Sequence, residues 1–389
     1  MQHQTNDFPA RYWKKCDDGQ IECLVCPRRC KLCDGQRGLC FVRARKGDEM
    51  VLTTWGRSSG FCIDPIEKKP LSHFYPGSSV LSFGTAGCNL TCKFCQNHDI
   101  SKSRQMDKLA FNATPEQIVK LALKENCKSL AYTYNDPVIF LEYAVDIARL
   151  ARTHKIKNVA VTAGYITTQA REEFFSHMDA VNLDLKAFSH NFYHKLCSAR
   201  LDDVLETARY IYHESDCWLE LTTLLIPQEN DSEKEITQMC DWILKHLGPD
   251  VPLHFTAFHP DFKMTDKPRT APETLKMART IALKAGIHYV YCGNIAESDV
   301  QTTYCPNCNK ALIIRSWHDL LDWRLGQGGH CMDCGTVIAG FFDTQPGQWK
   351  GRKPVIPGVN TVKLQLPDGR IVEAQIQAGF KKRKPVVNK

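Results

Sequence analysis

The sequence contains no long hydrophobic run. No segment of the 389 residues approaches the ~18 consecutive apolar residues that a membrane-spanning helix requires. The N-terminal residues from Met1 to Trp13 also lack the apolar centre of a secretory signal peptide. We therefore expect a cytoplasmic protein without a membrane partner.

A large excess of charge, long repeats and low-complexity tracts are also absent. The formal net charge is only +7, and part of it lies in the basic run at residues 381–384. A run this short is a weak sign of nucleic-acid binding, so a solvated tail is the favoured interpretation. Hydrophobic residues make up 43% of the chain, which is enough to bury a substantial core.

Cysteine, by contrast, is abundant. The chain has 19 cysteines, and most of them fall in three clusters with the spacing of metal ligands. In a chain expected in a reducing compartment, metal sites explain such clusters better than a framework of disulfides.

Strand-like and helix-like segments alternate through the middle of the chain. Strands are expected at residues 80–83, 129–134, 158–162, 180–186, 218–226, 253–258 and 288–292. A helix lies between each pair, and the first of these begins with Thr114 as its cap and Pro115 at its first position. Six strand–helix units and a terminal strand predict an α/β fold with a parallel sheet, a partial (β/α)6-like barrel. Chemistry in such barrels lies at the carboxyl ends of the strands.

The flanking regions divide the chain into four parts. Residues 1–76 are rich in Cys, Gly and charge, and they predict an irregular module organised by a metal. Residues 77–300 form the expected barrel core, and residues 301–345 a zinc-ribbon-like module. Residues 346–389 are expected to form a β-hairpin, with its turn at 367–369, and a basic tail.

The loop after the first barrel strand carries Cys88, Cys92 and Cys95 in the spacing C-x3-C-x2-C, with Phe94 before the last cysteine. Three thiolates are one fewer than a [4Fe–4S] cluster normally uses. One iron then stays open, and the amino nitrogen and carboxylate of an amino acid can chelate it. If that ligand is S-adenosyl-L-methionine (SAM), an electron from the cluster can break a C–S bond. A zinc site with His98 as its fourth ligand is the alternative.

This loop resembles the signature of the radical SAM superfamily. Longer stretches are similar to one subfamily, the radical SAM enzyme of the AmmeMemoRadiSam system, which is related to pyruvate formate-lyase activating enzymes. These stretches are residues 64–71, 73–78, 99–101, 132–135, 161–165, 182–186, 254–255, 258–260 and 290–294. The match runs from about Cys23 to Cys334.

The resemblance implies a partial (β/α) barrel, a [4Fe–4S] cluster on the three cysteines, and SAM as the second cofactor. It implies an enzyme that cleaves SAM reductively to a 5′-deoxyadenosyl radical. That radical abstracts hydrogen from an unknown substrate, such as a protein residue in the manner of an activase. A flavodoxin- or ferredoxin-like electron donor and companion proteins of the AmmeMemoRadiSam system are implied as partners.

The resemblance also extends to individual residues. Tyr134, Asn135 and Asp136 stand where relatives hold the SAM amino group, and Asp136 replaces a more frequent Glu. The implied cofactor-binding residues are Cys88, Cys92, Cys95, Phe94, Tyr134, Asn135, Asp136, Thr162 and Gly164. Asp184 and Lys186 match a strand that lies near SAM or the substrate. A catalytic role is one interpretation of this pair, and an ion pair at a strand end is the other.

Two further cysteine clusters flank the barrel. The expected N-terminal ligands are Cys23, Cys26, Cys30 and Cys40, with Cys33 spare. They fit tetrahedral Zn²⁺ or a second iron–sulfur cluster, and a reduced-thiol module without metal is the alternative. The C-terminal ligands are Cys305, Cys308, Cys331 and Cys334, in the pattern C-x2-C…C-x2-C. They predict a closed, structural Zn²⁺ site.

A rival hypothesis comes from a different class of protein. The chain could be a non-catalytic metal-binding adaptor whose zinc ribbon binds RNA or protein. Two histidines near a strand end, His254 and His259, are weak candidates for a substrate site, because a lone histidine is more often a packed or surface residue.

Overall fold

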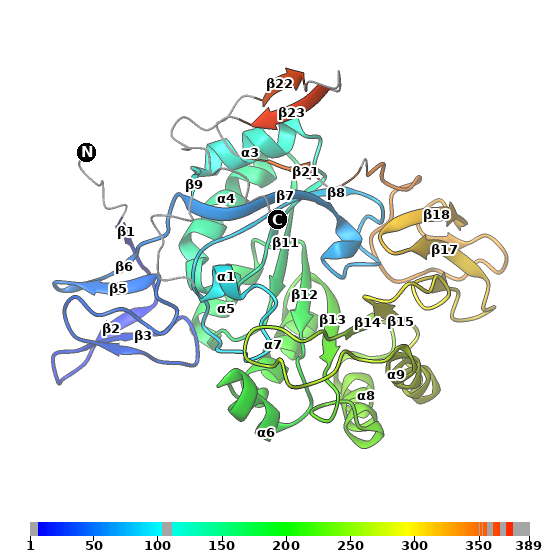
Figure 1. Cartoon of the computed structure of the whole chain (residues 1–389), viewed down its shortest axis with the longest axis horizontal. Coiled ribbons are helices and arrows are strands. Elements are labelled where there is room, and N and C mark those ends of the chain that lie inside the picture. The colour runs from blue at the N-terminus through cyan, green and yellow to red at the C-terminus, as the bar shows by residue number, and fades with distance from the viewer. Residues whose placement is uncertain are drawn as a thin grey trace, which may run out of the picture.

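A ten-stranded sheet forms the centre of the chain (Figure 1). The structure is a computed structural model that describes residues 7–102, 111–349, 351, 353–355, 361–365 and 371–375. Seven strands of the sheet are parallel, in the order β15-β14-β13-β12-β11-β10-β8. They are β8 (Ser79–Gly84), β10 (Ser129–Tyr132), β11 (Lys157–Thr162), β12 (Ala180–Asp184), β13 (Trp218–Leu225), β14 (Leu253–Ala257) and β15 (Val290–Gly293).

A long helix connects each pair of consecutive parallel strands, and the β8–β10 and β12–β13 connections also contain the short helices α1 (His98–Ser101) and α6 (His190–Phe192). The long helices are α3 (Pro115–Lys124), α4 (Leu141–Thr153), α5 (Thr168–Phe175), α7 (Leu201–Glu214), α8 (Glu233–Leu247) and α9 (Pro272–Ala285). Thr114 caps α3 in a capping box with Gln117. The Thr114 hydroxyl oxygen accepts from the Gln117 N–H, and the Gln117 side chain accepts from the Thr114 N–H. The six strand–helix units, the terminal strand and the α/β fold class are therefore confirmed.

Several boundaries differ from the predicted ones. The strand expected at residues 129–134 ends at Tyr132, because Tyr134 has a φ of 71° and cannot continue an extended strand. The strand expected at 180–186 ends at Asp184. The helix expected from Pro137 begins with a short 3₁₀ turn, η2 (Pro137–Phe140), before α4. All these changes lie at the carboxyl ends of strands.

The N-terminal residues form two small sheets beside the barrel. One contains β2 (Trp13–Lys15), β3 (Ile21–Cys23) and β4 (Lys31–Leu32), and the other β1 (Phe8–Pro9), β5 (Arg43–Lys46) and β6 (Glu49–Leu52). The next strand, β7 (Arg57–Pro65), pairs antiparallel with β8 and so belongs to the main sheet. It also pairs with β9 (Phe111–Asn112). The division expected between residues 76 and 77 therefore does not coincide with an edge of that sheet.

A buried ion pair attaches the N-terminal module, residues 7–52, to the barrel. Arg43 donates to both carboxylate oxygens of Glu142 on α4, at 2.8 and 2.9 Å. The side chains are 2% and 0% exposed. Arg43 also donates to the carbonyl oxygen of Arg11, whose backbone N–H donates to Glu142 at 2.6 Å. The pair is thus fully hydrogen-bonded on its carboxylate side, which is the arrangement that makes a buried charge tolerable.

The C-terminal module packs against the opposite side of the barrel (Figure 1). Its strands are β16 (Thr303–Tyr304), β17 (Ala311–Ser316), β18 (Asp319–Trp323), β19 (Leu325–Gly326) and β20 (His330–Cys331). Buried Arg315 on β17 donates to the carbonyl oxygen of Ser72 at 2.7 Å. The ring of His73 lies 2.6 Å from the carbonyl oxygen of Ala339. The loop at residues 66–77 therefore holds this module in place, with η1 (Ile66–Lys68) as its first turn.

The last part of the chain contributes two strand pairings. Strand β21 (Lys353–Pro354) pairs with β7 of the main sheet. Strands β22 (Thr361–Gln365) and β23 (Ile371–Gln375) pair antiparallel, in register Thr361 to Gln375. The turn expected at residues 367–369 and the basic tail beyond residue 376 lie outside the described residues. Among the helices that the structure describes, none has the length and apolar composition needed to cross a bilayer.

We expect Glu142→Gln to lower the free energy of unfolding by about 3–5 kcal/mol, because it leaves the Arg43 guanidinium buried without its counter-charge. Glu173→Gln is the matched control. Its partner Arg11 has a side chain that is 37% exposed, so the control should cost less than ~1 kcal/mol. Urea denaturation followed by circular dichroism measures both. Equal losses in the two variants would show that the buried pair is not what secures the module.

The same pair gives stability a pH dependence. Burial alone would raise the pKa of Glu142, but the Arg43 guanidinium outweighs burial and holds that pKa below its ordinary value. The stabilisation is therefore complete above the unfolded pKa of ~4.3 and is lost as the pH falls through the lower folded value. Glu142→Gln should abolish this component of acid denaturation.

Candidate active site at the carboxyl ends of the strands

A cavity of about 470 Å³ opens at the carboxyl ends of the parallel strands. Residues from the cysteine loop, the strand ends, the loop at residues 67–72 and the C-terminal module all line it. Because a barrel collects the ends of all its strands at one face, residues far apart in sequence meet there. The predicted site residues that line the cavity are Cys88, Cys92, Cys95, Phe94, Tyr134, Asn135, Asp136, Asp184 and Lys186.

The loop that carries the cysteine triplet is held from two sides. The Asn135 amide donates to the carbonyl oxygen of Gly87 at 2.8 Å and to the Thr85 hydroxyl at 3.2 Å. Backbone N–H groups of Thr91 and Lys93 donate to the segment that ends at Cys197, at 3.1 and 2.9 Å. The loop is therefore fixed before any ligand binds.

Gly87 is required where the loop meets the N-terminal module. Its φ is +86°, and a Cβ built on it would lie 1.9 Å from the carbonyl oxygen of Cys40. Only glycine permits this conformation and this approach of two backbones. The position of Cys88 thus depends on the module that precedes the barrel.

The three cysteine sulfurs face the cavity but are not gathered around one point. Among the described residues, only the C-terminal cysteines form a group of three or more possible ligands within 4.8 Å of one another. A four-iron cube places each thiolate on a separate corner, so wider spacing suits it better than it suits a single ion. His98 stacks on Phe262 with the ring centroids 5.1 Å apart and is not among the residues lining the cavity. The geometry does not favour the alternative zinc site.

Asp136 supplies an unsatisfied carboxylate oxygen to the cavity. Its Oδ1 accepts from the Thr162 hydroxyl at 2.7 Å, whereas Oδ2 is buried without a hydrogen-bond partner. Burial raises the pKa of Asp136 to about 6. The charge of Lys186 offsets burial only in part, and no ion pair to Asp136 is formed among the described residues. The ammonium group of an amino acid would supply the missing close counter-charge.

The other predicted cofactor residues divide into two groups. Tyr134 lines the cavity, with the Lys69 ammonium 5.3 Å from its ring centroid. Asn135 instead acts on the cysteine loop. Thr162 and Gly164 are not among the described residues that line the cavity: Thr162 orients Asp136, and the Gly164 N–H donates to the Thr162 hydroxyl at 3.0 Å.

Asp184 and Lys186 form an ion pair of 3.1 Å at the end of β12, and both line the cavity. Burial favours the neutral amine, but the Asp184 carboxylate and the Cys92 sulfur outweigh it and raise the pKa of Lys186. Lys186 therefore stays a cation beside the triplet. The contact between these two side chains is thus an ion pair at a strand end. Because both side chains also line the cavity, they are placed to act on a bound ligand as well.

Sequence reasoning missed a wall of the cavity. Arg315, Trp317 and His318 line it, although they belong to the C-terminal module. Arg315 reaches the site through Glu67, with Nε and Oε1 3.7 Å apart. A charged residue near the end of the otherwise apolar strand Ala311–Ser316 was the available signal, since an arginine buried in a strand needs a partner.

Two weak histidine candidates have different environments. His254 lines the cavity, and its Nε2 lies 2.7 Å from the buried carboxylate of Glu220. Burial acts to raise the pKa of Glu220, but the hydrogen bond and charge of His254 lower it overall. His259 has a half-exposed side chain and is 3.2 Å from Gln96. Only His254 is placed within the cavity wall.

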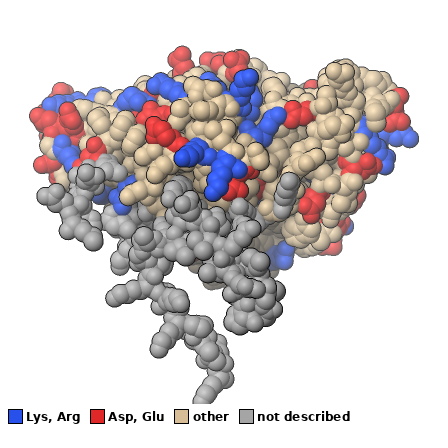
Figure 2. Space-filling view, turned by 90° about the horizontal axis from the view of Figure 1, so that it is seen from above, with Lys and Arg blue, Asp and Glu red and all other residues tan. Residues whose placement is uncertain are grey.

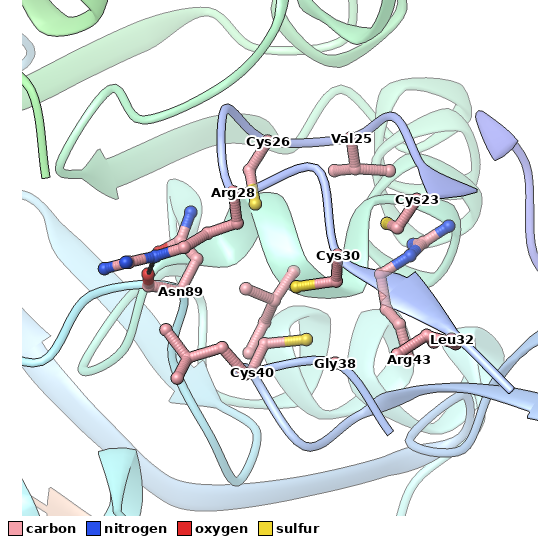
Figure 3. A pocket seen from close by; sticks show the side chains of 12 residues that line it. Cys23, Val25, Cys26, Arg28, Cys30, Leu32, Gly38, Cys40, Arg43 and Asn89 are labelled. Atoms are coloured by element: carbon pink, nitrogen blue, oxygen red, sulfur yellow. Dashed lines mark hydrogen bonds between the residues drawn. The ribbon is translucent and has the colours of Figure 1, made fainter. Parts of the chain in front are cut away.

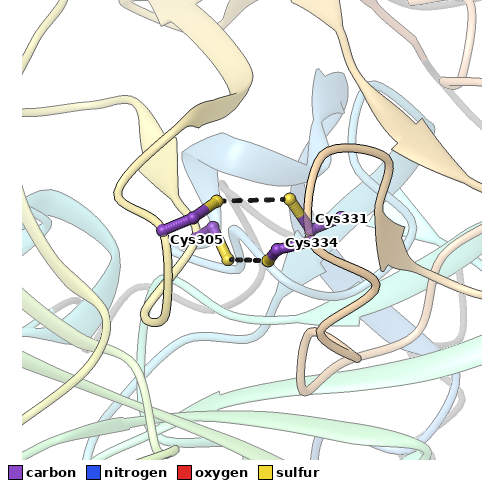
Figure 4. A group of neighbouring side chains, drawn as sticks. Cys305, Cys331 and Cys334 are labelled. Carbon is purple, nitrogen blue, oxygen red and sulfur yellow. Dashed lines mark hydrogen bonds between the residues drawn. The ribbon is translucent and has the colours of Figure 1, made fainter.

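The C-terminal cysteines lie close together (Figure 4). Sulfur pairs Cys305–Cys334 and Cys308–Cys331 are 3.5 and 3.6 Å apart. Tetrahedral zinc with Zn–S bonds of about 2.3 Å requires sulfurs roughly 3.8 Å apart. The four positions therefore have the spacing of a single-ion site.

The N-terminal cysteines surround a small cavity of about 20 Å³ (Figure 3). Its cysteine lining consists of Cys23, Cys26, Cys30 and Cys40. Cys33 is exposed, and its sulfur accepts from the Gln20 amide at 3.5 Å. The structure thus brings together the four residues expected as ligands, with the fifth outside.

Comparisons with known proteins identify related sequences. The sequence pattern of the Radical SAM superfamily matches residues 83–240. An uncharacterized protein, MJ0808, of Methanocaldococcus jannaschii is 39% identical over 306 residues, which cover 79% of this chain and 91% of that protein.

Similar solved structures were also found. A radical SAM methyltransferase from Sphaerobacter thermophilus has a TM-score of 0.47 and 14% identity, covering 75% of this chain and 78% of that one. A domain of a pyruvate-formate lyase-activating enzyme from Bacteroides vulgatus has a TM-score of 0.38 and 16% identity. That match covers 43% of this chain and 99% of that domain.

Proposed function

The chain belongs to the radical SAM superfamily of enzymes, and on this premise we propose that Cys88, Cys92 and Cys95 hold a [4Fe–4S] cluster to which SAM binds. The observation that carries the proposal is the meeting of three cysteines with the unsatisfied Oδ2 of Asp136 in one cavity. Three thiolates leave one iron for the amino acid part of SAM. The carboxylate supplies the counter-charge that the SAM ammonium requires.

The cofactors, when bound, supply one-electron cleavage of a SAM C–S bond and the resulting 5′-deoxyadenosyl radical, which abstracts hydrogen from the substrate. The chain contributes binding and orientation. Asp136 accepts the ammonium group, Thr162 fixes the direction of that carboxylate, and Lys186 provides a permanent positive charge beside Cys92. Phe94 is buried against Phe192, with ring centroids 5.6 Å apart, and excludes water behind the loop.

The substrate is proposed to enter between the strand ends and the C-terminal module. His254 and Asp184 from the barrel share the cavity with Trp317 and His318 from that module. The proposed substrate is a protein residue, as in an activase, or a small molecule bound to a partner. Either one would enter a site with one wall supplied by the C-terminal module. A flavodoxin- or ferredoxin-like electron donor and companion proteins of the AmmeMemoRadiSam system complete the proposal, and a cytoplasmic location is consistent with it.

The C-terminal cysteines are proposed to bind Zn²⁺ as a structural site. All four tetrahedral positions are occupied by sulfur, so no position remains for a reacting ligand. The RNA-binding adaptor is less well supported. On the face shown in Figure 2, acidic and basic side chains are interspersed and do not form one basic surface, whereas phosphate recognition depends on clustered positive charge.

We expect the anaerobically reconstituted chain to convert SAM to 5′-deoxyadenosine when dithionite is added. Cys92→Ala should abolish the product, because the cluster then loses one of its three thiolates. Cys127→Ala is the matched control, since Cys127 is a buried cysteine outside the cavity. Liquid chromatography of the nucleoside is the measurement. The enzymatic proposal fails if the loaded wild-type chain forms no product or if the Cys92 variant is as active.

We expect Asp136→Asn to weaken SAM binding by roughly 10- to 100-fold, the value of a hydrogen bond to a charged group. Equilibrium dialysis of labelled SAM against the loaded protein measures this change without turnover. Asp136→Glu should retain most of the affinity, because it keeps the charge. If Asn and Glu variants bind equally well, the carboxylate is not the ammonium site.

We expect Cys305→Ser to remove one zinc per chain and to lower solubility, because a small ribbon depends on its metal to fold. The absorbance of the central cluster should persist. Metal analysis and the visible spectrum test this together, with Cys16→Ser as a control outside the three clusters. Loss of the visible chromophore in the Cys305 variant would contradict the separate roles of the two sites.

A further inference from the structure

A second cysteine site lies behind the cavity, within the N-terminal module. Cys23, Cys26, Cys30 and Cys40 line a cavity of about 20 Å³, and Figure 3 shows their sulfurs directed toward a common space. This volume exceeds the ~10–15 Å³ that one water molecule needs. Val25, Leu32 and Ile139 complete an apolar lining. We call these four residues the cysteine cage.

The spacing of the cage sulfurs differs from that of the C-terminal site. Within the described part of the chain, the only group of three or more possible ligands within 4.8 Å of one another is the C-terminal set. No three cage sulfurs therefore approach as a single tetrahedral ion requires, at roughly 3.8 Å. Four separated thiolates around a common space suit a cluster that offers each of them its own iron.

Two arginines at the cage have unused donors. Arg43 Nε and Arg28 Nη2 are buried without a hydrogen-bond acceptor, although both residues line the cage. Arg43 is 2% exposed, so water does not satisfy it. An iron–sulfur cluster on four thiolates carries negative charge and offers sulfur acceptors, and N–H donors to those sulfurs are the usual surroundings of such clusters. The Arg28 guanidinium is directed toward Asn89 in Figure 3, so the orphaned Nε of Arg43 is the donor that an anionic cluster in the cage would use.

The cage touches the loop of the cysteine triplet. Asn89, which lies between Cys88 and Cys92, lines the cage, and its carbonyl oxygen accepts from Arg28 Nε at 2.8 Å. On the other side of Cys88, Gly87 packs against the carbonyl oxygen of Cys40. Short packed and hydrogen-bonded connections therefore run from the cage to the triplet.

We propose that Cys23, Cys26, Cys30 and Cys40 bind a second [4Fe–4S] cluster that passes electrons to the triplet cluster. The relay rests on the proposed function, whereas the cluster itself does not. All four irons of the cage cluster have protein ligands, so it binds no SAM. In its reduced state it gives one electron to the triplet cluster and becomes oxidised. A low-potential one-electron protein donor then reduces it again. The electron passed to the triplet cluster is used to cleave the C–S bond of SAM, which yields methionine and the 5′-deoxyadenosyl radical.

The metal in the cage is tested with a chain whose three triplet cysteines are changed together, Cys88→Ala, Cys92→Ala and Cys95→Ala. The cage residues are untouched, so the test does not depend on a damaged module folding. After anaerobic reconstitution this variant should keep about four irons per chain, against about eight in the wild type. Its reduced electron paramagnetic resonance spectrum should not change when SAM is added. Zinc in place of those four irons, or no metal beyond the C-terminal zinc, would overturn the proposal.

The relay is tested with Cys26→Ser, and Cys33→Ser is the matched control because Cys33 lies outside the cage. Freeze-quenched paramagnetic resonance follows how fast the triplet cluster is reduced by a flavodoxin-type donor. We expect the Cys26 variant to lose this rapid reduction but to keep its SAM-sensitive signal with dithionite. Unchanged reduction by the protein donor would overturn the relay. If the wild-type chain itself shows no paramagnetic resonance signal that responds to SAM, the proposed function is overturned instead.

Discussion

The docking of the N-terminal module on the barrel is the constraint on which the candidate active site depends. It rests on the buried Arg43–Glu142 pair, which is hydrogen-bonded on both carboxylate oxygens. Once the module is docked, the backbone at Cys40 lies against Gly87, one residue before the first cysteine of the triplet. A loop with three metal ligands must have its sulfurs at fixed positions, because ligand geometry is set by the surrounding contacts as much as by the ligands themselves. The barrel supplies some of those contacts, and the N-terminal module supplies others through Cys40 and Arg28.

The cavity is built from the strand ends, the cysteine loop, the loop at residues 66–77 and the C-terminal module, and buried polar residues join these parts. Glu220 on β13 accepts from the backbone of Ser72 and His73, at 2.9 and 2.8 Å. His73 in turn contacts the Tyr291 hydroxyl at 2.6 Å, and Arg315 reaches the same loop from the C-terminal module. In a low-dielectric interior such networks are strong when every member has a partner. They explain how an irregular loop can form a defined wall of the cavity.

Local signals in the sequence predicted much of the fold. The strand–helix units are short-range patterns, and the spacing of the triplet and of the C-terminal cysteines is visible within a few residues. The same reasoning chose Cys33 as the spare cysteine, and the sets of metal ligands stay predictions. The superfamily prediction is confirmed, while the AmmeMemoRadiSam assignment stays a prediction.

Contacts between distant residues could not be predicted in this way. The amide of Asn135 bonds Gly87, 48 residues away, and Arg315 bonds Ser72 across 243 residues. The family pattern places Asn135 and Thr162 beside the cofactor, which stays a prediction, and the structure adds that Asn135 holds the cysteine loop and Thr162 orients a carboxylate. Such roles depend on which side chains meet in the fold. Only the three-dimensional arrangement separates a residue that contacts a ligand from one that supports the contact.

The wall formed by Arg315, Trp317 and His318 has a consequence for biogenesis. These residues leave the ribosome more than two hundred positions after the triplet, so the nascent barrel exposes its cysteine loop until the last module folds. The wall of the cavity is therefore complete only after the C-terminal module has folded and Arg315 has bonded to Ser72.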